Sequence, residues 1–455
     1  MAAAPLTVVV GAGISGLTCA YALKKSGRTV LVLEASARPG GYIETVEENG
    51  FLFELGPQSF SATEPLFKLC QELGILNQLV EAPRGAPRYI VIDGKLVPVP
   101  LSPGAFLASS LFSWRTKFSI LADIFRTSVP ADTDESVATF VRTRFTAELL
   151  DRLVAPFVSG IYAGDPEKLS LQAAFPKIHE AEKASGSIIR GSIRLAKNKT
   201  APQQTRRPGL YSFQKGNATL TQSLADFLGT AIRYNAKVEQ EIRRDGDCFV
   251  LKIESNRGSE EVRGKKLVLA TPTGVNADLL RLITPAATVP SIDIEYAPVT
   301  VVSHGYRKDQ VGTPLRGFGF LIPRSKKMHT LGTVWNSSLF AGRAPADHVL
   351  MTSFIGGACK SNGGEGLSEA ESAEFVQREV GDLLRISGSP VIERVTNYRT
   401  AIPQYNIGHT ERLQTIREAA AKVPGLWLTG NYWKGPAIGA CIEHALAVAE
   451  EIRVC

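Results

Sequence analysis

The sequence predicts an α/β plus α+β protein that consists of a discontinuous Rossmann-like domain, a domain with a mixed sheet and a mostly helical insertion. Three observations lead to this fold class. The chain opens with an apolar strand, a glycine turn and a helix, and closes with the same succession, at Leu426 to Thr429, Gly430 and Ala440 to Ile452. Between these ends, residues 105 to 200 have helical spacing, and residues 295 to 360 alternate in the manner of strands. We therefore expect the two ends to share one sheet.

Length and composition exclude several classes of protein. The 455 residues suit two or three domains. The net charge of +7 is spread along the chain, without the basic stripe and aromatic platforms that nucleic-acid binding requires. The six cysteines lack CxxC spacing and the six histidines lack metal spacing, so we expect no metal site and a reducing, cytoplasmic environment. Met1 to Pro5 carries no basic side chain, and we expect no removable targeting segment there.

The first element is the apolar strand Thr7 to Val10, which leads through a glycine turn into a helix, Ser15 to Lys25. Glycines allow the tight turn and let a pyrophosphate approach the backbone, where N–H groups at the start of the helix hold the anion. The turn residues are Gly11, Ala12, Gly13, Ile14, Ser15 and Gly16. The position of this turn between a strand and a helix indicates a dinucleotide site.

The second strand, Thr29 to Leu33, ends at Glu34. This carboxylate can accept hydrogen bonds from both ribose hydroxyls of an adenosine, and it would repel a 2′-phosphate, so NADP is disfavoured. The alternative is a surface ion pair between Glu34 and Arg28 or Arg38. No second GxGxxG follows in the chain, so a nicotinamide domain is not indicated, and we expect the substrate's electrons to pass to a diffusible acceptor, most simply O2.

Further along, strands are expected at Phe51 to Glu54 and Arg88 to Ile92. Between Lys95 and Arg115 lie 19 uncharged residues, which prolines interrupt, so a spanning helix is disfavoured. The remaining piece, Ala105 to Phe118, suits a segment that lies in a membrane interface, with Phe112 and Trp114 among its aromatic residues. An ordinary core helix is the alternative.

Several motifs together resemble a known family. The order E-A-S-x-R-x-G-G after the second strand resembles the signature of the FAD-dependent amine oxidase and porphyrinogen oxidase superfamily. Four later segments are similar to the protoporphyrinogen oxidase family, in the same order along the chain: Phe53 to Phe60, Ser159 to Ser170, Ala401 to Tyr405 and Leu428 to Ile438. The sequence departs from the family pattern at Tyr42, Gln58 and Phe213 to Asn217.

The resemblance implies FAD as the cofactor, bound in an extended pose. It assigns residues 1–60, 215–275 and 395–455 to the FAD-binding domain, 61–95 and 276–394 to the substrate-binding domain, and 96–214 to a mostly helical membrane-associating domain. Carried over residue by residue, the cofactor contacts are Gly11, Ala12, Gly13, Ile14, Ser15, Gly16, Glu34, Ala35, Arg38, Gly40, Gly41, Tyr42, Gly56, Pro57, Gln58, Ser59, Val238, Gly430, Asn431, Pro436, Ala437 and Ile438.

The resemblance also implies a porphyrinogen substrate. Arg88 matches an arginine that pairs with a propionate, Leu321 and Val334 match apolar residues above and below the macrocycle, Phe354 matches a stacking aromatic, and Gly160 offers backbone nearby. No side chain is expected to be catalytic, because the flavin N5 carries the chemistry. An arginine fork is suited to a carboxylate, whereas it would repel the substrate of an amine oxidase.

Taken together, the expected activity is oxidation of protoporphyrinogen IX to protoporphyrin IX, with H2O2 as by-product. The expected location is cytoplasmic and peripheral to a membrane surface, without nucleic acid. A homodimer is one option for the oligomeric state. The alternatives are a coproporphyrinogen III oxidase of the same family, an amine oxidase, and a flavin-binding membrane-surface protein without turnover.

Overall fold

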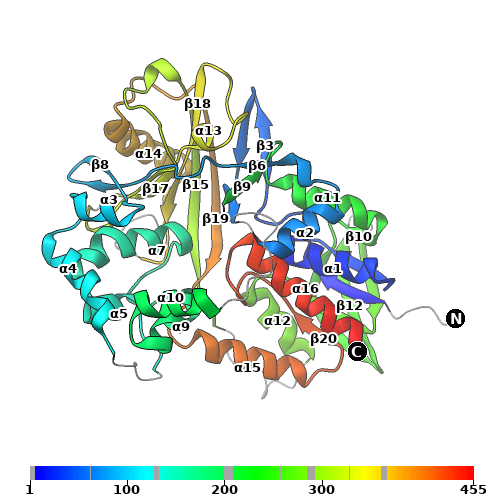
Figure 1. Ribbon diagram of the computed structural model, residues 1–455. Helices are drawn as coiled ribbons and strands as arrows, with labels where there is room; N and C mark the ends of the chain where they lie inside the picture. Colours follow the sequence, from blue (N-terminus) through cyan, green and yellow to red (C-terminus); the bar gives the residue numbers. More distant parts are fainter. Residues whose placement is uncertain are drawn as a thin grey trace.

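Figure 1 shows the computed structural model of the chain. It describes residues 6–61, 63–127, 133–198, 209–255, 258–283, 293–326, 328–359 and 366–455. The segment Met1 to Pro5, on which the expectation about targeting rests, lies outside these ranges.

A parallel sheet joins the first and last strands of the chain. Its order is β10-β2-β1-β14-β20, and β14 pairs with β1 on one side and with β20 on the other. The prediction that the two ends share one sheet is confirmed. The strands are β1 (Thr7–Val10), β2 (Val30–Leu33), β10 (Ile232–Arg233), β14 (Lys266–Leu269) and β20 (Leu426–Leu428).

Both faces of this parallel sheet are covered by other elements. Because successive side chains of a strand point to opposite faces, each strand contributes to the apolar core on both sides. Val9 packs with the helices on one face, whereas Val8 and Val10 pack on the other. The first face carries α1 (Ile14–Lys25), α2 (Glu64–Glu72), α11 (Ala218–Leu228) and α16 (Ile438–Val454). The second carries β11 (Lys237–Asp245), β12 (Cys248–Ser255), β13 (Gly258–Gly264), α12 (Thr273–Ile283) and α15 (His409–Ala421).

A mixed sheet of seven strands stands beside the first one (Figure 1). Its order is β19-β15-β18-β17-β16-β7-β8, and β16 and β7 pair in parallel. One of its faces packs against α14 (Glu369–Leu384). The strands are β7 (Arg88–Ile92), β8 (Lys95–Pro98), β15 (Tyr296–Arg307), β16 (Gly319–Leu321), β17 (Thr330–Val334), β18 (His348–Gly356) and β19 (Ile392–Pro403), and α13 (Asn336–Leu339) follows β17. Two expected domain boundaries, at residues 95 and 394, therefore fall inside strands of this sheet.

The remaining strands of the first half of the chain form two small sheets. One pairs β3 with β4, and the other has the order β5-β9-β6. They are made of β3 (Thr45–Glu48), β4 (Phe51–Glu54), β5 (Phe60–Ser61), β6 (Leu79–Glu81) and β9 (Leu210–Phe213).

The insertion between these strands is mostly helical and has its own apolar core, which Leu111, Phe140 and Val158 share. In Figure 1 its cyan and green helices lie to the left and below, and α4 lies farthest from the chain termini. In the ranges that the structure describes, no helix is both long and apolar enough to cross a membrane. The helices are α3 (Pro103–Ala108), α4 (Trp114–Ala122), η2 (Asp123–Phe125), α5 (Val137–Arg144), α6 (Ala147–Leu149), the π-helix η3 (Leu150–Val154), α7 (Ala155–Tyr162), α8 (Leu171–Ala174), α9 (Pro176–Ser185) and α10 (Ile188–Asn198).

The stretch from 105 to 118 does not form one helix. It is divided between α3 and α4, because Ser113 caps a new helix by accepting a hydrogen bond from the Thr116 N–H. Phe112, which was expected in a membrane interface, is 5 % exposed and belongs to the core of the insertion, whereas Trp114 is 61 % exposed. The prediction for Phe112 is therefore wrong, since neighbouring aromatic residues point in opposite directions at the start of α4.

Candidate active site

The three glycines of the first turn have different reasons to be glycine. Gly11 has a φ of +100°, and a Cβ on Gly16 would lie 2.0 Å from the Gly11 carbonyl oxygen. Packing within the protein therefore requires glycine at both positions. At Gly13, by contrast, a Cβ would meet nothing within 4 Å. The space over Gly13 is open, so this is where a ligand can approach the backbone.

Two helices begin beside this turn. α1 starts after Gly13 and α16 starts after Ala437, and neither helix has a side-chain cap or an acidic residue in its first turn. The helices pack side by side (Figure 1), and the Ser15 hydroxyl hydrogen-bonds the Cys441 thiol, whose pKa burial raises to about 11. Uncapped N–H groups and two helix dipoles therefore meet where an anion such as a pyrophosphate fits.

Glu34 lies beside the turn, directly after β2. Its carboxylate accepts hydrogen bonds from the Ala12 N–H at 2.7 Å and from the Ser36 N–H and hydroxyl at 2.8 and 2.7 Å. Arg38 instead pairs with Glu44, and Arg28 donates to the Arg453 carbonyl oxygen. The alternative of a surface ion pair for Glu34 is therefore wrong.

The neighbours of Glu34 are consistent with a site for an adenosine. Ala35 is exposed beside it, and the Ala236 N–H donates to the Glu34 carbonyl oxygen at 2.8 Å. Val238 lies two residues farther along the same segment and packs against the core that includes Leu33. Val238 thus lies on the strand that borders the Glu34 end of the site.

The second glycine pair lies directly against the first turn. The Gly40 N–H donates to the Ala12 carbonyl oxygen at 2.8 Å, and a Cβ on Gly41 would lie 3.4 Å from the Gly13 Cα. Arg38 holds this turn by donating to the Gly41 carbonyl oxygen at 3.0 Å. Hydrogen bonds and an ion pair therefore fix the backbone beside the open space at Gly13.

Tyr42 and the segment after Gly56 continue the wall of the site. A Cβ on Gly56 would lie 1.9 Å from the Tyr42 carbonyl oxygen, so the two segments touch. The Tyr42 ring packs edge-on against Tyr398 at 5.3 Å, and its hydroxyl donates to the Thr400 carbonyl oxygen. Tyr42 thereby connects the cofactor turn to β19 of the seven-stranded sheet.

The buried Gln58 side chain shapes the loop that it belongs to. Its amide nitrogen donates to the carbonyl oxygens of Glu54 and Gly56 at 2.9 and 2.8 Å, and its amide oxygen accepts from Asn336 at 2.6 Å. The Pro57 carbonyl oxygen accepts from Asn217 at 2.7 Å, and Ser59 follows half-buried. These bonds occupy both nitrogen donors of Gln58, so its side chain positions the loop through protein contacts.

The loop before α16 carries the remaining expected cofactor residues. The Asn431 carbonyl oxygen accepts a hydrogen bond from the Tyr405 hydroxyl at 2.6 Å, and the Tyr432 carbonyl oxygen lies 2.9 Å from Nε2 of His409. Gly430 lies in this loop, and Pro436, Ala437 and Ile438 lead from it into α16. The last strand and helix are thus held next to the segment that ends β19.

Four of the five expected substrate residues, all except Gly160, share one face of the seven-stranded sheet. Arg88 pairs in register with Gly319, which pairs in register with Val334. Cross-strand partners point to the same face, so Arg88 and Val334 do as well. The Arg88 guanidinium is exposed and lies over the Phe318 ring at 5.0 Å, and no carboxylate pairs with it in the described ranges. It is therefore available to an external carboxylate.

The same face of the sheet also carries the residues two positions farther along β16 and β17. Leu321 pairs with Gly332, and Gly332 pairs with Phe354. From the opposite side α7 approaches this row, since a Cβ on Gly160 would lie 2.8 Å from a Leu321 methyl group. Phe354 and Tyr398 pack against the same apolar cluster, and the Tyr398 ring contacts that of Tyr42. The structure brings the expected substrate residues together and joins them to the cofactor side.

A buried ion pair next to this site was not expected from the sequence. Glu54 and Arg343 are both 1 % exposed, with 3.8 Å between their charged groups. Burial raises the pKa of Glu54 to about 7, against the opposing effects of Arg343 and of hydrogen bonds from Thr45 and Asn217. Arg343 also donates to the Ser212 hydroxyl at 2.6 Å. No local signal marks Arg343, because its partners lie in distant parts of the chain.

Two histidines contact the loop before α16. Burial lowers the pKa of both His409 and His444 to about 4, so these imidazoles are neutral near pH 7. No group of three histidine, cysteine, aspartate or glutamate side chains in the described part of the chain is placed to hold a metal ion. The arrangement offers an anion site, a ribose acceptor and an apolar sheet face with one free arginine.

An anion site at a glycine turn beside an apolar sheet face suits a dinucleotide-dependent oxidoreductase. Residues 14–453 match the family described as flavin containing amine oxidoreductase, so the chain belongs to that family. It is a flavin-dependent oxidase, and its cofactor is FAD. The open space at Gly13 and the two uncapped helix ends fit the pyrophosphate of this cofactor.

Within the family, the chain is similar to protoporphyrinogen oxidases and, at lower identity, to coproporphyrinogen III oxidases. It is 38 % identical to the chloroplastic protoporphyrinogen oxidase of Oryza sativa, over 98 % of this chain and 87 % of the relative. Identity to the coproporphyrinogen III oxidase of Bacillus subtilis is 26 %, over 98 % and 97 %. A crystal structure from Exiguobacterium sp., provisionally named a protoporphyrinogen oxidase, has the same fold, with a TM-score of 0.83 at 24 % identity over 99 % of each chain.

Proposed function

We propose that this protein oxidises protoporphyrinogen IX to protoporphyrin IX in porphyrin and heme biosynthesis, with O2 as electron acceptor and H2O2 as by-product. The observation that carries the proposal is the 36 to 38 % identity to plant protoporphyrinogen oxidases over 98 % of this chain. Two coproporphyrinogen III oxidases are 26 and 28 % identical over the same share. The sheet face that carries Arg88, Leu321 and Phe354 supports a flat, apolar substrate with a carboxylate at its edge.

In this proposal the protein binds the cofactor and the substrate and orients them, and its side chains do not exchange protons with the substrate. When bound, FAD supplies the acceptor for a hydride from a bridging carbon of the porphyrinogen. Arg88 pairs with a propionate, and a guanidinium keeps its charge at any working pH. Leu321 and Val334 hold the two faces of the macrocycle, and Phe354 stacks on a pyrrole ring. Their apolar surroundings exclude water and fix the ring within reach of the cofactor.

An anaerobic titration tests the proposal. Protoporphyrinogen IX, coproporphyrinogen III and a primary amine are added separately to the oxidised holoenzyme, and the loss of flavin absorbance is recorded. We expect rapid bleaching by protoporphyrinogen IX, and slower or no bleaching by the other two. Faster bleaching by coproporphyrinogen III or by the amine would assign the activity to that substrate. Absence of bleaching by all three would indicate a flavin-binding protein without turnover.

We also propose that the protein docks on a membrane surface through α4 and η2. Trp114, Phe118, Leu121 and Phe125 follow one another at spacings of three and four residues, and they are 61, 64, 46 and 83 % exposed. Spacings of three and four residues place side chains on one face of a helix. α4, which carries most of this stripe, lies at the edge of the molecule farthest from α1 (Figure 1).

The groups next to the stripe fit the boundary between lipid and water. The Lys117 ammonium lies 4.5 Å from the centre of the Trp114 ring, but Lys117 is buried and donates to the Leu107 carbonyl oxygen at 2.7 Å, so the exposed Arg115 is the cation available to lipid beside the stripe. Aromatic side chains with adjacent cations are typical of segments that lie at headgroup depth and meet anionic lipid.

The homodimer that we considered from the sequence stays a prediction, which sedimentation velocity of the holoenzyme tests.

A further inference from the structure

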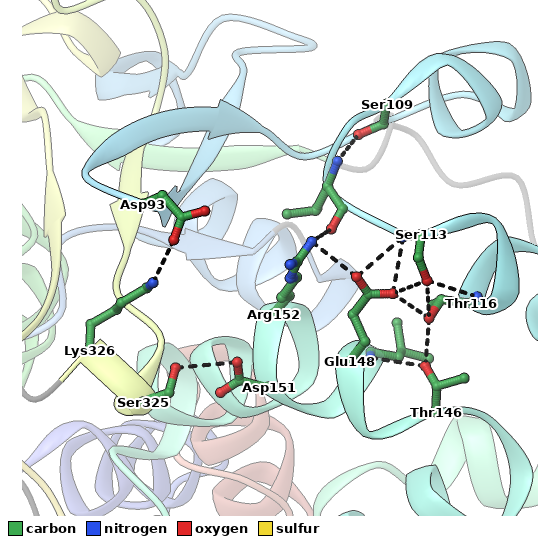
Figure 2. A network of polar contacts seen from close by, with 12 residues as sticks. Asp93, Ser109, Ser113, Thr116, Thr146, Glu148, Asp151, Arg152, Ser325 and Lys326 are labelled. Carbon is green, nitrogen blue, oxygen red and sulfur yellow. Dashed lines mark hydrogen bonds and ion pairs between the residues drawn. The ribbon is translucent and has the colours of Figure 1, made fainter.

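A short 3₁₀ turn, η7 (Arg324–Lys326), connects the proposed substrate face to three other elements. It follows β16, which ends at Leu321. Arg324 bonds to α7, the Ser325 hydroxyl donates to Asp151 of η3 at 3.2 Å, and the Lys326 ammonium pairs with Asp93 in the β7–β8 turn at 3.0 Å. Figure 2 shows the last two of these contacts. Three consecutive side chains thus fasten the helical insertion and the β7–β8 turn to one end of β16.

Arg324 makes the contacts closest to the proposed substrate residues. Its Nε donates to the Ser159 hydroxyl at 2.8 Å, and its Nη2 donates to the Gly164 carbonyl oxygen at 3.0 Å. These two acceptors lie on either side of Gly160 and of the last turn of α7. Between them Ala163 has a φ of +47°, a left-handed conformation that a residue other than glycine adopts only at some cost.

The environment of Arg324 is unusual for a cation. Its Nη1 is buried without a hydrogen-bond partner, and no carboxylate pairs with the guanidinium in the part of the chain that the structure describes. Burial lowers the pKa of Arg324, and the Cys359 thiol and Asp165 act in the opposite direction. A buried cation without an ion-pair partner costs folding free energy. The hydrogen bonds to Ser159 and Gly164 and a further one to the Cys359 side chain offset part of this cost.

The same helix end is held from two further strands. The Ala358 N–H, which follows β18, donates to the Ala163 carbonyl oxygen at 2.7 Å. The Gln404 side chain, which follows β19, donates to the Tyr162 carbonyl oxygen at 2.9 Å. β18 carries Phe354 and β16, which carries Leu321, leads to Arg324, so the end of α7 is fixed to two of the four strands that carry proposed substrate residues.

We propose that Arg324 is a positioning residue for porphyrinogen binding, because it fixes α7 so that Gly160 keeps its distance from Leu321. This inference rests on the proposed function. Arg324 does not touch the substrate in this scheme. It fixes the position of α7 against Leu321, on which the placement of a flat ring beside this row of residues depends. Loss of the clamp should therefore weaken substrate binding while the FAD site around Gly13 stays intact.

The test compares Arg324→Gln with wild type as holoenzymes, with rates expressed per bound FAD. We expect the KM for protoporphyrinogen IX to rise about 10-fold, which corresponds to about 1.4 kcal/mol. Smaller changes are expected in kcat and in the flavin spectrum. Hydrogen exchange should accelerate at residues 155–164. Arg324→Lys, whose ammonium can reach one of the two acceptors, should recover part of the KM. An unchanged KM per bound FAD would overturn the inference, even with a lower Tm.

The matched control is Lys326→Ala. It lies in the same turn and removes an exposed ion pair, which contributes little stability, and it leaves the contacts of α7 in place. Its KM should stay within about 2-fold of wild type, and an equal rise in both variants would show that η7 acts as a whole rather than through Arg324. If Arg324→Gln does not fold, Ser159→Ala removes one of its two bonds and should give a smaller rise in KM.

The two proposals fail in different ways. Wild-type protein that does not oxidise protoporphyrinogen IX refutes the proposed function. The clamp is then judged by hydrogen exchange alone, and unchanged exchange at residues 155–164 in Arg324→Gln refutes it.

Discussion

Replacement of Gly13 by alanine should weaken FAD binding without changing the stability of the apoprotein. Gly13 caps α1 with φ −68° and ψ 174°, which alanine adopts without strain, and its Cβ would meet no protein atom within 4 Å. Alanine is a poorer N-cap than glycine by about 0.5–1 kcal/mol. It also restricts the unfolded chain, which stabilises the fold by about 0.4–1 kcal/mol. The two effects offset each other, so the stability of the apoprotein should change by less than about 1 kcal/mol.

Gly16→Ala is the matched comparison within the same turn. Its Cβ would lie 2.0 Å from the Gly11 carbonyl oxygen, so backbone has to move, at a cost of about 3 kcal/mol or more. Unfolding entropy of about 2.1 cal/mol/K per residue gives about 1 kcal/mol/K for 455 residues. The melting temperature of the apoprotein should therefore fall by about 3 °C or more in Gly16→Ala, and stay within about 1 °C in Gly13→Ala.

In contrast to its small effect on stability, Gly13→Ala should have a large effect on FAD binding. A methyl group in the open space at Gly13 would keep a pyrophosphate from the N–H groups of α1, and would remove at least one charge-assisted hydrogen bond, of about 1.5–3 kcal/mol. The Kd of the apoprotein for FAD should rise roughly 10- to 150-fold. Fluorescence titration with FAD measures this, next to thermal melts without FAD. If Gly13→Ala binds FAD within about 2-fold of wild type, the pyrophosphate does not lie over Gly13.

Three further predictions concern substrate, membrane and pH. Arg88→Ala should raise the KM for protoporphyrinogen IX by about 10-fold or more with FAD still bound, since a charged hydrogen bond is worth about 1.5–3 kcal/mol; loss of the yellow cofactor would contradict this assignment. Trp114→Ser with Phe118→Ser should leave the melting temperature unchanged, because both side chains are exposed, and should release the protein from anionic vesicles in a flotation assay; unchanged flotation would exclude this surface. His409 and His444 have folded pKa values of about 4, below the ordinary 6.5, so the stability from their neutral forms is complete above about pH 6.5 and is lost as the pH falls towards 4. Melts at a series of pH values should show this decline and a flatter profile for His444→Gln, whereas identical profiles would refute it.

Local sequence patterns predicted the elements that local physics determines. The strands Thr7 to Val10, Phe51 to Glu54 and Arg88 to Ile92 have the bounds that were expected from their apolar and alternating patterns. The glycine turn was predictable because it requires a particular backbone at fixed spacing between a strand and a helix. The same holds for the carboxylate of Glu34 at the end of the second strand, which now contacts that turn.

What the patterns could not predict depends on contacts between distant residues. Phe112 and Trp114 are both aromatic, yet Phe112 packs in a core with residues such as Ile90 and Phe140, and Trp114 faces outward. Gln58 bonds to Asn336, which lies 278 positions away, and no motif of either segment announces this contact. The family resemblance supplied the candidate substrate residues, and the cross-strand register then showed that they lie on one face.

The position of β14 between β1 and β20 has a consequence for how the protein is made. A ribosome adds about 5–20 residues per second, so roughly 8 to 30 s pass between synthesis of β14, which ends at Leu269, and of β20, which begins at Leu426. During that interval the edge of β14 that later receives Leu426 to Leu428 has no partner from its own sheet. The nascent chain therefore exposes an apolar strand edge, and a chaperone that shields such edges should raise the yield of flavin-loaded enzyme.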